Sequence, residues 1–462
     1  MPHYDVIIIG AGLSGLAAGI RLAHFGRRVR IFEKHTLPGG LNSYFYSGRE
    51  RLDVGLHALT NLAPEQERGA PLNKLLRQLR LDRKSLHLQE QNFSLLDFPG
   101  CKLRFNNQSE IFEQEIARAF PCQLAGYRAF LERIRATDYL SPEAPAQSTR
   151  LVLAEYISDS LLREMLLCPV MFYGNAQIQD MDFNQFCVIF TSIFQEGLGR
   201  PRDGMQPLLK ALLQRFRDSG GELSLGNGIT KILNCGGRVT AVVDERGAVH
   251  RTEALISSIG SRETADCCQE PPPEFRQSAP GQLSFVETIF RLRCHPREFG
   301  PQASIIFRNE LPAFTFAPPP GPVDFNSQVF CLPGNFQGCE NIPAARQIRL
   351  TQLANPQFWL QAGDQEYRQA KEETLVKQRE LLEKIHPGCQ AEILQSEMFT
   401  PRTILRYTGH QNGAIYGSPD KIRSGLCSCP NLFLCGTDQG FLGIVGALLS
   451  GTAIVNRHLL LG

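Results

Sequence analysis

The chain has 462 residues, of which 48 are Lys or Arg and 46 are Asp or Glu, so its formal net charge is +2. This near balance gives no reason to expect nucleic acid as a partner. Hydrophobic residues make up 42% and charged residues 20%, as in an ordinary globular protein, which excludes the collagen-like, disordered and mini-protein classes. At about 100 to 200 residues per domain, the length predicts two or three domains.

Cysteine usage and hydropathy predict where the protein resides. The 14 cysteines form no CxxC pair, and no secretory leader precedes the first strand-like segment, so we expect a cytoplasmic protein with reduced thiols and no metal site. Two uncharged, mostly apolar stretches, 6–20 and 441–455, have 15 residues each. A helix that spans a bilayer needs roughly 20 residues, so neither stretch is expected to be a membrane span.

The N-terminal segment has the complete pattern of a dinucleotide-binding site. An apolar, β-branched run of the kind buried in a parallel sheet leads into GxGxxG, and a helical stretch, a second strand and an acidic residue follow. In chain order these features are 4–9, Gly10, Gly12, Gly15, 16–25, 29–32 and Glu33. The glycines allow a tight turn and close approach of a pyrophosphate, the helix N-terminus stabilises its charge, and the acid accepts hydrogen bonds from a ribose.

A second glycine loop follows at 37–43 (LPGGLNS). Its Gly39 and Gly40 let the backbone lie against a cofactor with no Cβ in the way. With this loop, the segment resembles the FAD-dependent superfamily that includes amine oxidases, phytoene desaturases, carotenoid isomerases and retinol saturases, and 52–60 (LDVGLHALT) resembles the D-x-G segment that follows in that family. The resemblance implies FAD as the cofactor and an α/β fold with a Rossmann-type FAD-binding domain.

Two departures from the family pattern indicate which branch of the superfamily the chain resembles. Amine oxidases and bacterial phytoene desaturases commonly carry Arg directly after the glycine pair, where this chain has Leu41, so pyrophosphate contacts must come from the backbone or another cation. Near the C-terminus, 431–459 predicts a strand ending at Gly436, a loop and a helix from about Gly443, and its G-x-D and GAL run looks most like retinol saturases. Both features favour the saturase and isomerase branches. The alternative is a buried C-terminal helix with Asp438 as a capping residue.

The resemblance also implies which residues touch the cofactor. Residues 229–232 resemble the strand that contacts adenine through main-chain groups. The implied FAD contacts are Gly10, Gly12, Ser14, Gly15, Glu33, Lys34, Gly39, Gly40, Leu41, Ile229, Gly436, Asp438 and Gly446. No convincing catalytic dyad stands out. His57, His410 and Tyr416 are candidates for proton transfer because they lie near cofactor-associated stretches, although such residues are more often structural.

The middle of the chain, 72–200, has helical patterning with few glycines. Four phenylalanines in it recur at spacings of three and four, which places them on one face of a helix: Phe183, Phe186, Phe190 and Phe194. They form either a core stripe, which is the interpretation we prefer, or the wall of a tunnel for a long apolar substrate.

The remaining patterns predict the domain organisation. The sequence 284–293 alternates as a half-buried strand does, with 304–307 and 328–332 as possible partner strands. We expect a discontinuous FAD-binding domain and a substrate domain built from a mixed sheet plus helices. The FAD-binding parts are 1–70, 201–270 and 401–462, and the substrate parts are a helical region at 71–200 and a sheet region at 271–400.

The leading functional hypothesis is an FAD-dependent oxidoreductase that desaturates, saturates or isomerises carbon–carbon double bonds in a long hydrophobic substrate. Such a substrate would be collected from a membrane, so peripheral attachment is an indirect expectation. One alternative is oxidation of a small amine, which Leu41 and the single Trp of the chain disfavour. The other is a lipid escort like the Rab GDP dissociation inhibitors, which the intact glycine loops disfavour. The sequence does not identify the electron acceptor.

Overall fold

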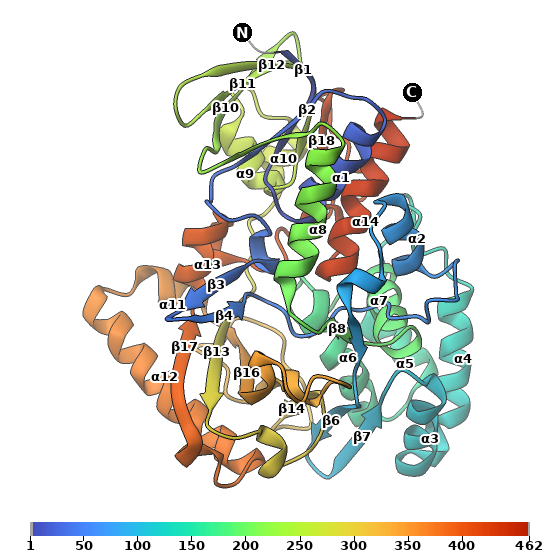
Figure 1. The fold of residues 1–462 in the computed structure, drawn as a ribbon. Coiled ribbons are helices and arrows are strands. Elements are labelled where there is room, and N and C mark those ends of the chain that lie inside the picture. Colours follow the sequence, from blue (N-terminus) through green and yellow to red (C-terminus); the bar gives the residue numbers. More distant parts are fainter. Residues whose placement is uncertain (1–2, 461–462) are drawn as a thin grey trace.

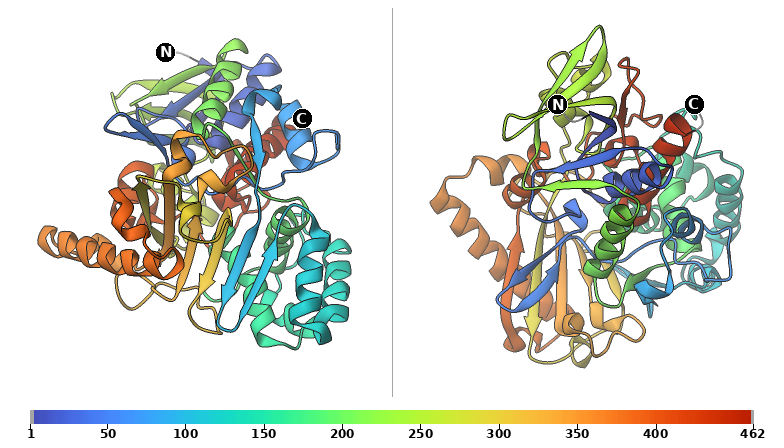
Figure 2. Two further views of the ribbon diagram at one scale, coloured as in Figure 1. Left: turned by 60° about the horizontal axis from the view of Figure 1, so that its bottom comes forward. Right: turned by 45° about the horizontal axis from the view of Figure 1, so that its top comes forward.

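The chain folds around two seven-stranded sheets, seen one above the other in Figure 1. The computed structural model describes residues 3–460, with the backbone alone at Cys235. A group of helices lies beside the lower sheet at one end, and a long helix lies near its other end (Figures 1 and 2). The expected α/β class with a mixed second sheet is confirmed.

The first sheet carries the dinucleotide-site pattern. Its strand order is β10-β11-β12-β1-β2-β9, and β18 pairs with the C-terminal end of β12. The strands are β1 (His3–Ile9), β2 (Val29–Glu33), β9 (Glu222–Leu225), β10 (Ile229–Cys235), β11 (Arg238–Asp244), β12 (Val249–Ser257) and β18 (Leu432–Leu434). β1 is parallel to both β2 and β12, so its apolar residues are buried on both faces.

Helix α1 (Leu13–His24) begins three residues before the expected position 16, because the amide of Leu16 already donates to the carbonyl of Gly12. Helices α8 (Met205–Asp218) and α14 (Gly443–Ile454) pack against α1 on one face of the sheet (Figure 1). A Cβ at Gly451 would lie 1.9 Å from the carbonyl oxygen of Ser14, so only glycine lets α14 approach α1 this closely. The two short helices α9 (Ser261–Cys267) and α10 (Pro273–Gln277) cover the other face.

The second sheet has the order β17-β13-β16-β15-β14-β6-β7, and β14 runs parallel to β6 while the other pairs are antiparallel. The strands are β6 (Ser94–Phe98), β7 (Cys101–Phe105), β13 (Ser284–Leu292), β14 (Ile305–Asn309), β15 (Ser327–Cys331), β16 (Gln347–Ala354) and β17 (Ile393–Phe399). The long helix α12 (Asp364–Ile385) packs beside β13 and β16, where Thr288 donates to Gln378 at 2.6 Å.

Two expectations about this sheet were wrong. β14 and β15 belong to the sheet but do not pair with β13, whose neighbours are β16 and β17. The helical region also contains two strands of the sheet, β6 and β7. All five residues of β6 are buried, so its sequence SLLDF lacks the alternation that marks a half-buried strand.

The helical region packs around the phenylalanine stripe. Its helices are α3 (Ser109–Ala119), α4 (Leu124–Arg135), α5 (Thr149–Tyr156), α6 (Ser160–Gly174) and α7 (Phe183–Phe190), and α7 continues as a wider turn over Thr191–Gln195. The four stripe phenylalanines are at most 2% exposed. They stack on one another and on neighbours such as Phe112, whose ring centre is 4.6 Å from that of Phe194. The stripe is therefore core, and the tunnel interpretation is wrong for these residues.

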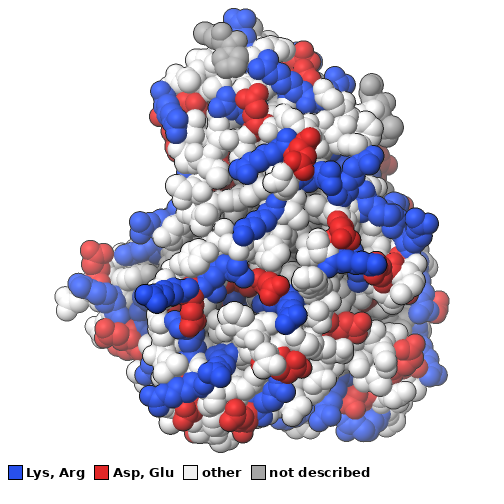
Figure 3. Space-filling view, in the orientation of Figure 1, with Lys and Arg blue, Asp and Glu red and all other residues white. Residues whose placement is uncertain are grey.

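Charges of both signs are interspersed over the face shown in Figure 3, in keeping with the near-neutral composition. Within residues 3–460, no helix combines the length and the apolar character that crossing a membrane requires.

The core position of Phe186 predicts a large effect on stability and none on ligand entry. Phe186→Ala removes a fully buried ring, so the free energy of unfolding should fall by about 3 to 5 kcal/mol, whereas Phe186→Leu should cost much less. Urea unfolding followed by circular dichroism measures both. An unchanged unfolding midpoint with altered binding of an apolar ligand would restore the tunnel interpretation.

Candidate functional site

A cavity of about 690 Å³ lies between the two sheets and is lined by residues from both. Most of the sequence-predicted site residues line it. They are Gly10, Gly12, Ser14, Glu33, Lys34, Gly39, Gly40, Leu41, Ile229 and Gly436, together with His57, His410 and Tyr416. The structure thus brings together segments that are hundreds of residues apart in the chain.

The three glycines of GxGxxG have different structural tasks. Gly10 has a φ of +96°, which favours glycine, and a Cβ at Gly15 would lie 2.1 Å from the carbonyl oxygen of Gly10. Gly15 therefore packs under the turn and does not line the cavity. A Cβ at Gly12 would meet nothing within 4 Å, so this position faces open cavity space that a ligand can use.

The second glycine loop lies directly beside this turn. The amide of Gly39 donates to the carbonyl of Ala11 at 2.9 Å, and Gly39 has a φ of +110°. The first turn of α1 contains no acidic residue and no side chain caps its N-terminus, so its free amides present partial positive charge to the cavity. No arginine is among the residues that line the cavity, so a bound pyrophosphate would meet these amides, with Lys34 as a lining cation, in place of the arginine that relatives carry at position 41.

Glu33 ends β2 at the cavity wall, and its carboxylate is held in place by two backbone amides. Ala11 and His35 each donate to it at 2.8 Å. A fixed carboxylate at the end of the second strand is the group that binds an adenosine ribose in dinucleotide folds. The two glycine loops, the helix N-terminus and Glu33 together fit FAD.

Besides Gly15, two implied FAD contacts lie outside the cavity lining. Asp438 is buried outside the cavity lining and accepts hydrogen bonds from the amide and hydroxyl of Ser261 and from the amide of Ser418, at 2.7 to 2.8 Å. It therefore holds the first residue of α9, a different helix from the C-terminal one named in the capping alternative. Gly446 also lies outside the lining, where a Cβ would be 3.0 Å from the carbonyl carbon of Phe441.

Among the three candidates for proton transfer, His57 has the strongest chemical setting. Its Nε2 is 3.3 Å from a carboxylate oxygen of Glu287 on β13 and 3.0 Å from the hydroxyl of Thr351 on β16. All three side chains line the cavity. A histidine held by a carboxylate and a hydroxyl is the arrangement that orients a general acid or base.

The carboxylate of Glu287 is itself held by the buried guanidinium of Arg349, which donates to it. Burial alone raises the pKa of Glu287, but Arg349 and His57 outweigh burial and lower the pKa to about 2. Glu287 is therefore a permanent anion beside His57. Glu287 was not predicted from the sequence, because a polar residue in an alternating strand gives no local signal of its partner.

The D-x-G segment supports the same cluster. Asp53 accepts a hydrogen bond at 2.9 Å from the amide of Met205 at the start of α8, and Arg349 donates to the carbonyl of Asp53 at 2.9 Å. The buried Arg200 lies 3.5 Å from the Asp53 carboxylate. Asp53 therefore caps a helix and joins the first glycine segment to the second sheet.

The other two candidates make contacts that stabilise the cavity wall. The hydroxyl of Tyr416 donates to the carbonyl of Phe172, and burial raises the pKa of Tyr416. His410 lies 3.6 Å from Glu263. Neither is joined to both an acid and a hydroxyl as His57 is. Within residues 3–460, no group of three or more His, Cys, Asp or Glu side chains is placed to hold a metal ion.

Comparisons with known proteins identify the family and the fold of this chain. The family model described as flavin containing amine oxidoreductase matches residues 13–290. A chloroplastic prolycopene isomerase of an Oncidium hybrid cultivar is 21% identical, with 98% of this chain and 84% of the relative covered. A phytoene dehydrogenase of Streptomyces griseus is 27% identical over 53% of this chain and 52% of its own length. The crystal structure of an oxidoreductase from Methanosarcina mazei has a TM-score of 0.70 at 15% identity, covering 98% of this chain and 100% of that one, which shows a shared fold.

The roles of the second and third glycines of GxGxxG can be separated by mutation. Gly12→Ala adds a methyl group in open cavity space, so the apoprotein should keep its unfolding midpoint while FAD binds at least about tenfold more weakly. Gly15→Ala forces the turn apart and should lower the unfolding midpoint by several degrees. Thermal unfolding and flavin fluorescence titration measure these effects. Equal FAD affinity in Gly12→Ala and the wild type would contradict this placement of the cofactor.

The pKa of Glu287 predicts a pH-dependent contribution to stability. Because folding lowers this pKa from its ordinary value of 4.5 to about 2, the contribution is complete above about pH 4.5 and is lost as the pH falls toward 2. At neutral pH, Glu287→Gln should cost about 3 to 5 kcal/mol, since Arg349 stays buried without its partner.

Urea unfolding as a function of pH measures this contribution, and the variant should lack the loss of stability between pH 4.5 and 2. The control is Glu222→Gln, which weakens half-exposed ion pairs with Arg28 and Arg30 and should cost about 1 kcal/mol or less. Equal costs for the two variants would rule out the buried anion.

Proposed function

The chain belongs to the family of flavin-containing amine oxidoreductases, and we propose that it uses FAD to desaturate, saturate or isomerise carbon–carbon double bonds in a long hydrophobic substrate. When bound, FAD supplies the redox chemistry, exchanging hydride with the carbon chain. The names of its relatives, a prolycopene isomerase and a phytoene dehydrogenase, support this class of chemistry.

The observation that carries the proposal is the apolar, aromatic part of the cavity. Phe172 stacks on Phe285 with ring centres 5.8 Å apart, and Phe285 meets the ring of Tyr416 edge-on at 5.9 Å. Ile415, Phe441 and Ile444 extend this wall. Such a surface excludes water and binds a hydrocarbon chain through apolar contact rather than through charge.

His57 gives this part of the cavity a group that can move a proton. Within residues 3–460 its Nδ1 has no hydrogen-bond partner, whereas Nε2 is held by Glu287 and Thr351. We assign to Nδ1 the proton that a carbon of the substrate loses or gains. Glu287 and Thr351 are positioning residues, because they fix the ring without facing the substrate carbon themselves.

The same contacts disfavour a small amine as substrate. An ammonium group would need an unpaired carboxylate at the aromatic wall, and Glu287 is already paired with Arg349 and His57. A lipid escort without cofactor is disfavoured because Gly12 leaves open space for FAD. A polyene substrate dissolves in lipid, so we place this cytoplasmic enzyme at a membrane surface when it collects its substrate.

The proposal is tested with purified protein and a panel of polyenes from retinoids to carotenoids. We expect flavin absorption bands that bleach with dithionite, and conversion of at least one polyene under anaerobic conditions, resolved by chromatography. His57→Gln should retain flavin while the conversion rate falls by roughly 10² to 10⁴. The control His87→Gln alters an exposed histidine outside the cavity and should match the wild type.

Three results would contradict the proposal. A folded protein that neither contains nor takes up flavin would exclude an FAD enzyme. Oxidation of amines without any polyene conversion would assign the other substrate class. Full activity of His57→Gln would remove His57 from the chemistry.

A further inference from the structure

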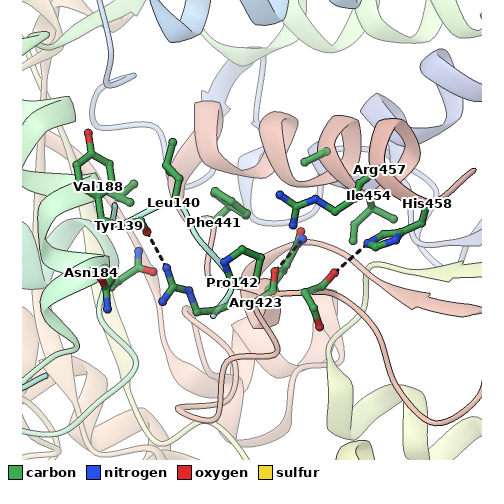
Figure 4. Close-up of a pocket in the computed structure, with 15 residues that line it drawn as sticks. Tyr139, Leu140, Pro142, Asn184, Val188, Arg423, Phe441, Ile454, Arg457 and His458 are labelled. Atoms are coloured by element: carbon green, nitrogen blue, oxygen red, sulfur yellow. Dashed lines mark hydrogen bonds between the residues drawn. The ribbon is translucent and has the colours of Figure 1, made fainter. Parts of the chain in front are cut away.

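A small surface pocket of about 50 Å³ lies on the outer side of Phe441. Phe441 is the one residue that lines both this pocket and the main cavity. The other walls of the pocket come from the loop at 139–142, from α7 and from the C-terminal helical turns. In Figure 4, Phe441 lies between Leu140 and Pro142, and Asn184 and Val188 of α7 lie to one side. One aromatic side chain therefore stands between the surface pocket and the cavity.

Glycines with positive φ flank Phe441 in the backbone. Gly440 and Gly443 have φ values of +95° and +72°, so Phe441 and Leu442 form a short bridge between two glycines in conformations that other residues rarely adopt. Two further glycines leave room for this bridge. A Cβ at Gly446 would lie 3.0 Å from Phe441, and a Cβ at Gly174 would lie 3.0 Å from Leu442.

The loops around the bridge, in contrast, are held in place by hydrogen bonds. The guanidinium of Arg423 donates to the carbonyls of Tyr139 at 2.6 Å and Ala144 at 3.3 Å, which holds the loop (Figure 4). His458 donates to the carbonyl of Ser424 at 3.3 Å. These polar groups are used in holding the loops, and the loop presents Leu140 to solvent, 55% exposed. The pocket mouth is therefore a fixed frame in which the apolar Leu140 and Val188 lie beside polar side chains such as Arg457.

The bridge lies at the aromatic end of the cavity, where an apolar chain would react. Leu442 packs against Gly174, which directly follows Phe172 and Tyr173 of the aromatic wall. The two glycine loops that fit FAD, 10–15 and 37–43, lie at other segments of the lining, whereas Gly436, also an implied FAD contact, lines the cavity five residues before Phe441.

We propose that this surface pocket is the entry port for the hydrocarbon chain of the substrate and that Phe441 is its gate. This inference rests on the proposed function. Rotation of Phe441 between Gly440 and Gly443 joins the pocket to the cavity. Leu140 and Val188 then line the passage, and closure of the ring over the bound chain keeps water away from His57.

The test follows binding of parinaric acid, an 18-carbon conjugated polyene, to the FAD-loaded enzyme by stopped-flow fluorescence. Phe441→Ala opens the gate and should raise the association rate by at least about fivefold. The dissociation rate should rise at least as much, because Phe441 also belongs to the apolar wall of the cavity. Leu140→Glu places a charge on the rim and should slow both rates by a similar factor. Leu394→Glu is the control, because Leu394 is 56% exposed, close to the 55% of Leu140, but lies on β17 outside both pockets.

The outcomes separate the gate from the proposed function. If Phe441→Ala raises only the dissociation rate, Phe441 is a binding contact and the gate is overturned. If Leu140→Glu behaves like Leu394→Glu, the chain enters elsewhere and the port is overturned. If the wild-type enzyme binds no parinaric acid while it retains FAD, the polyene substrate class fails, and the entry port argued from that class fails with it.

Discussion

A chain of buried charges holds the two halves of the site in register. Arg349 of the second sheet bonds both to the Asp53 carbonyl, next to the glycine segments, and to Glu287, which in turn holds His57. Arg200 completes the chain beside the Asp53 carboxylate. Removing one member of such a network leaves an uncompensated charge in the interior, which costs more than the pair contributes. The position of His57 at the cavity wall therefore depends on contacts made by segments on both sides of the cavity.

Close backbone approach is the second constraint on the site. Gly15 allows α1 to begin directly under the first turn, and Gly451 allows α14 to lie against α1. These contacts bring the start of α14 to the cavity, which places Phe441 at the aromatic wall. A side chain at either glycine would push the helices apart and widen the cavity at the point where it separates from the surface pocket. The glycine pattern thus shapes the region of the substrate as well as that of the cofactor.

Much of the cofactor half could be predicted because its signals are local. A strand, a glycine turn, a helix and Glu33 follow one another within a few residues, so chain connectivity alone brings them together. The sequence left two interpretations open where a residue type permits two roles. Asp438 has the position of a family contact, but its carboxylate accepts hydrogen bonds from the amides of Ser261 and Ser418. The spacing of the stripe phenylalanines predicted a shared helix face, yet burial of that face depends on helices elsewhere in the chain.

The sequence by itself indicated an α/β fold with a dinucleotide site, because the glycine loops must have their spacing to bend around a pyrophosphate. Its resemblance to the FAD-dependent superfamily implied that the dinucleotide is FAD. Only the tertiary structure decided which side chains accompany His57. Glu287 and Thr351 lie on neighbouring strands more than two hundred residues away along the chain, and strand pairing in the second sheet places them side by side. Periodicity predicts the face of a strand on which a residue lies, but it does not predict which strand pairs with it. For the same reason, the position of Phe441 between two cavities becomes visible only once the helices have packed.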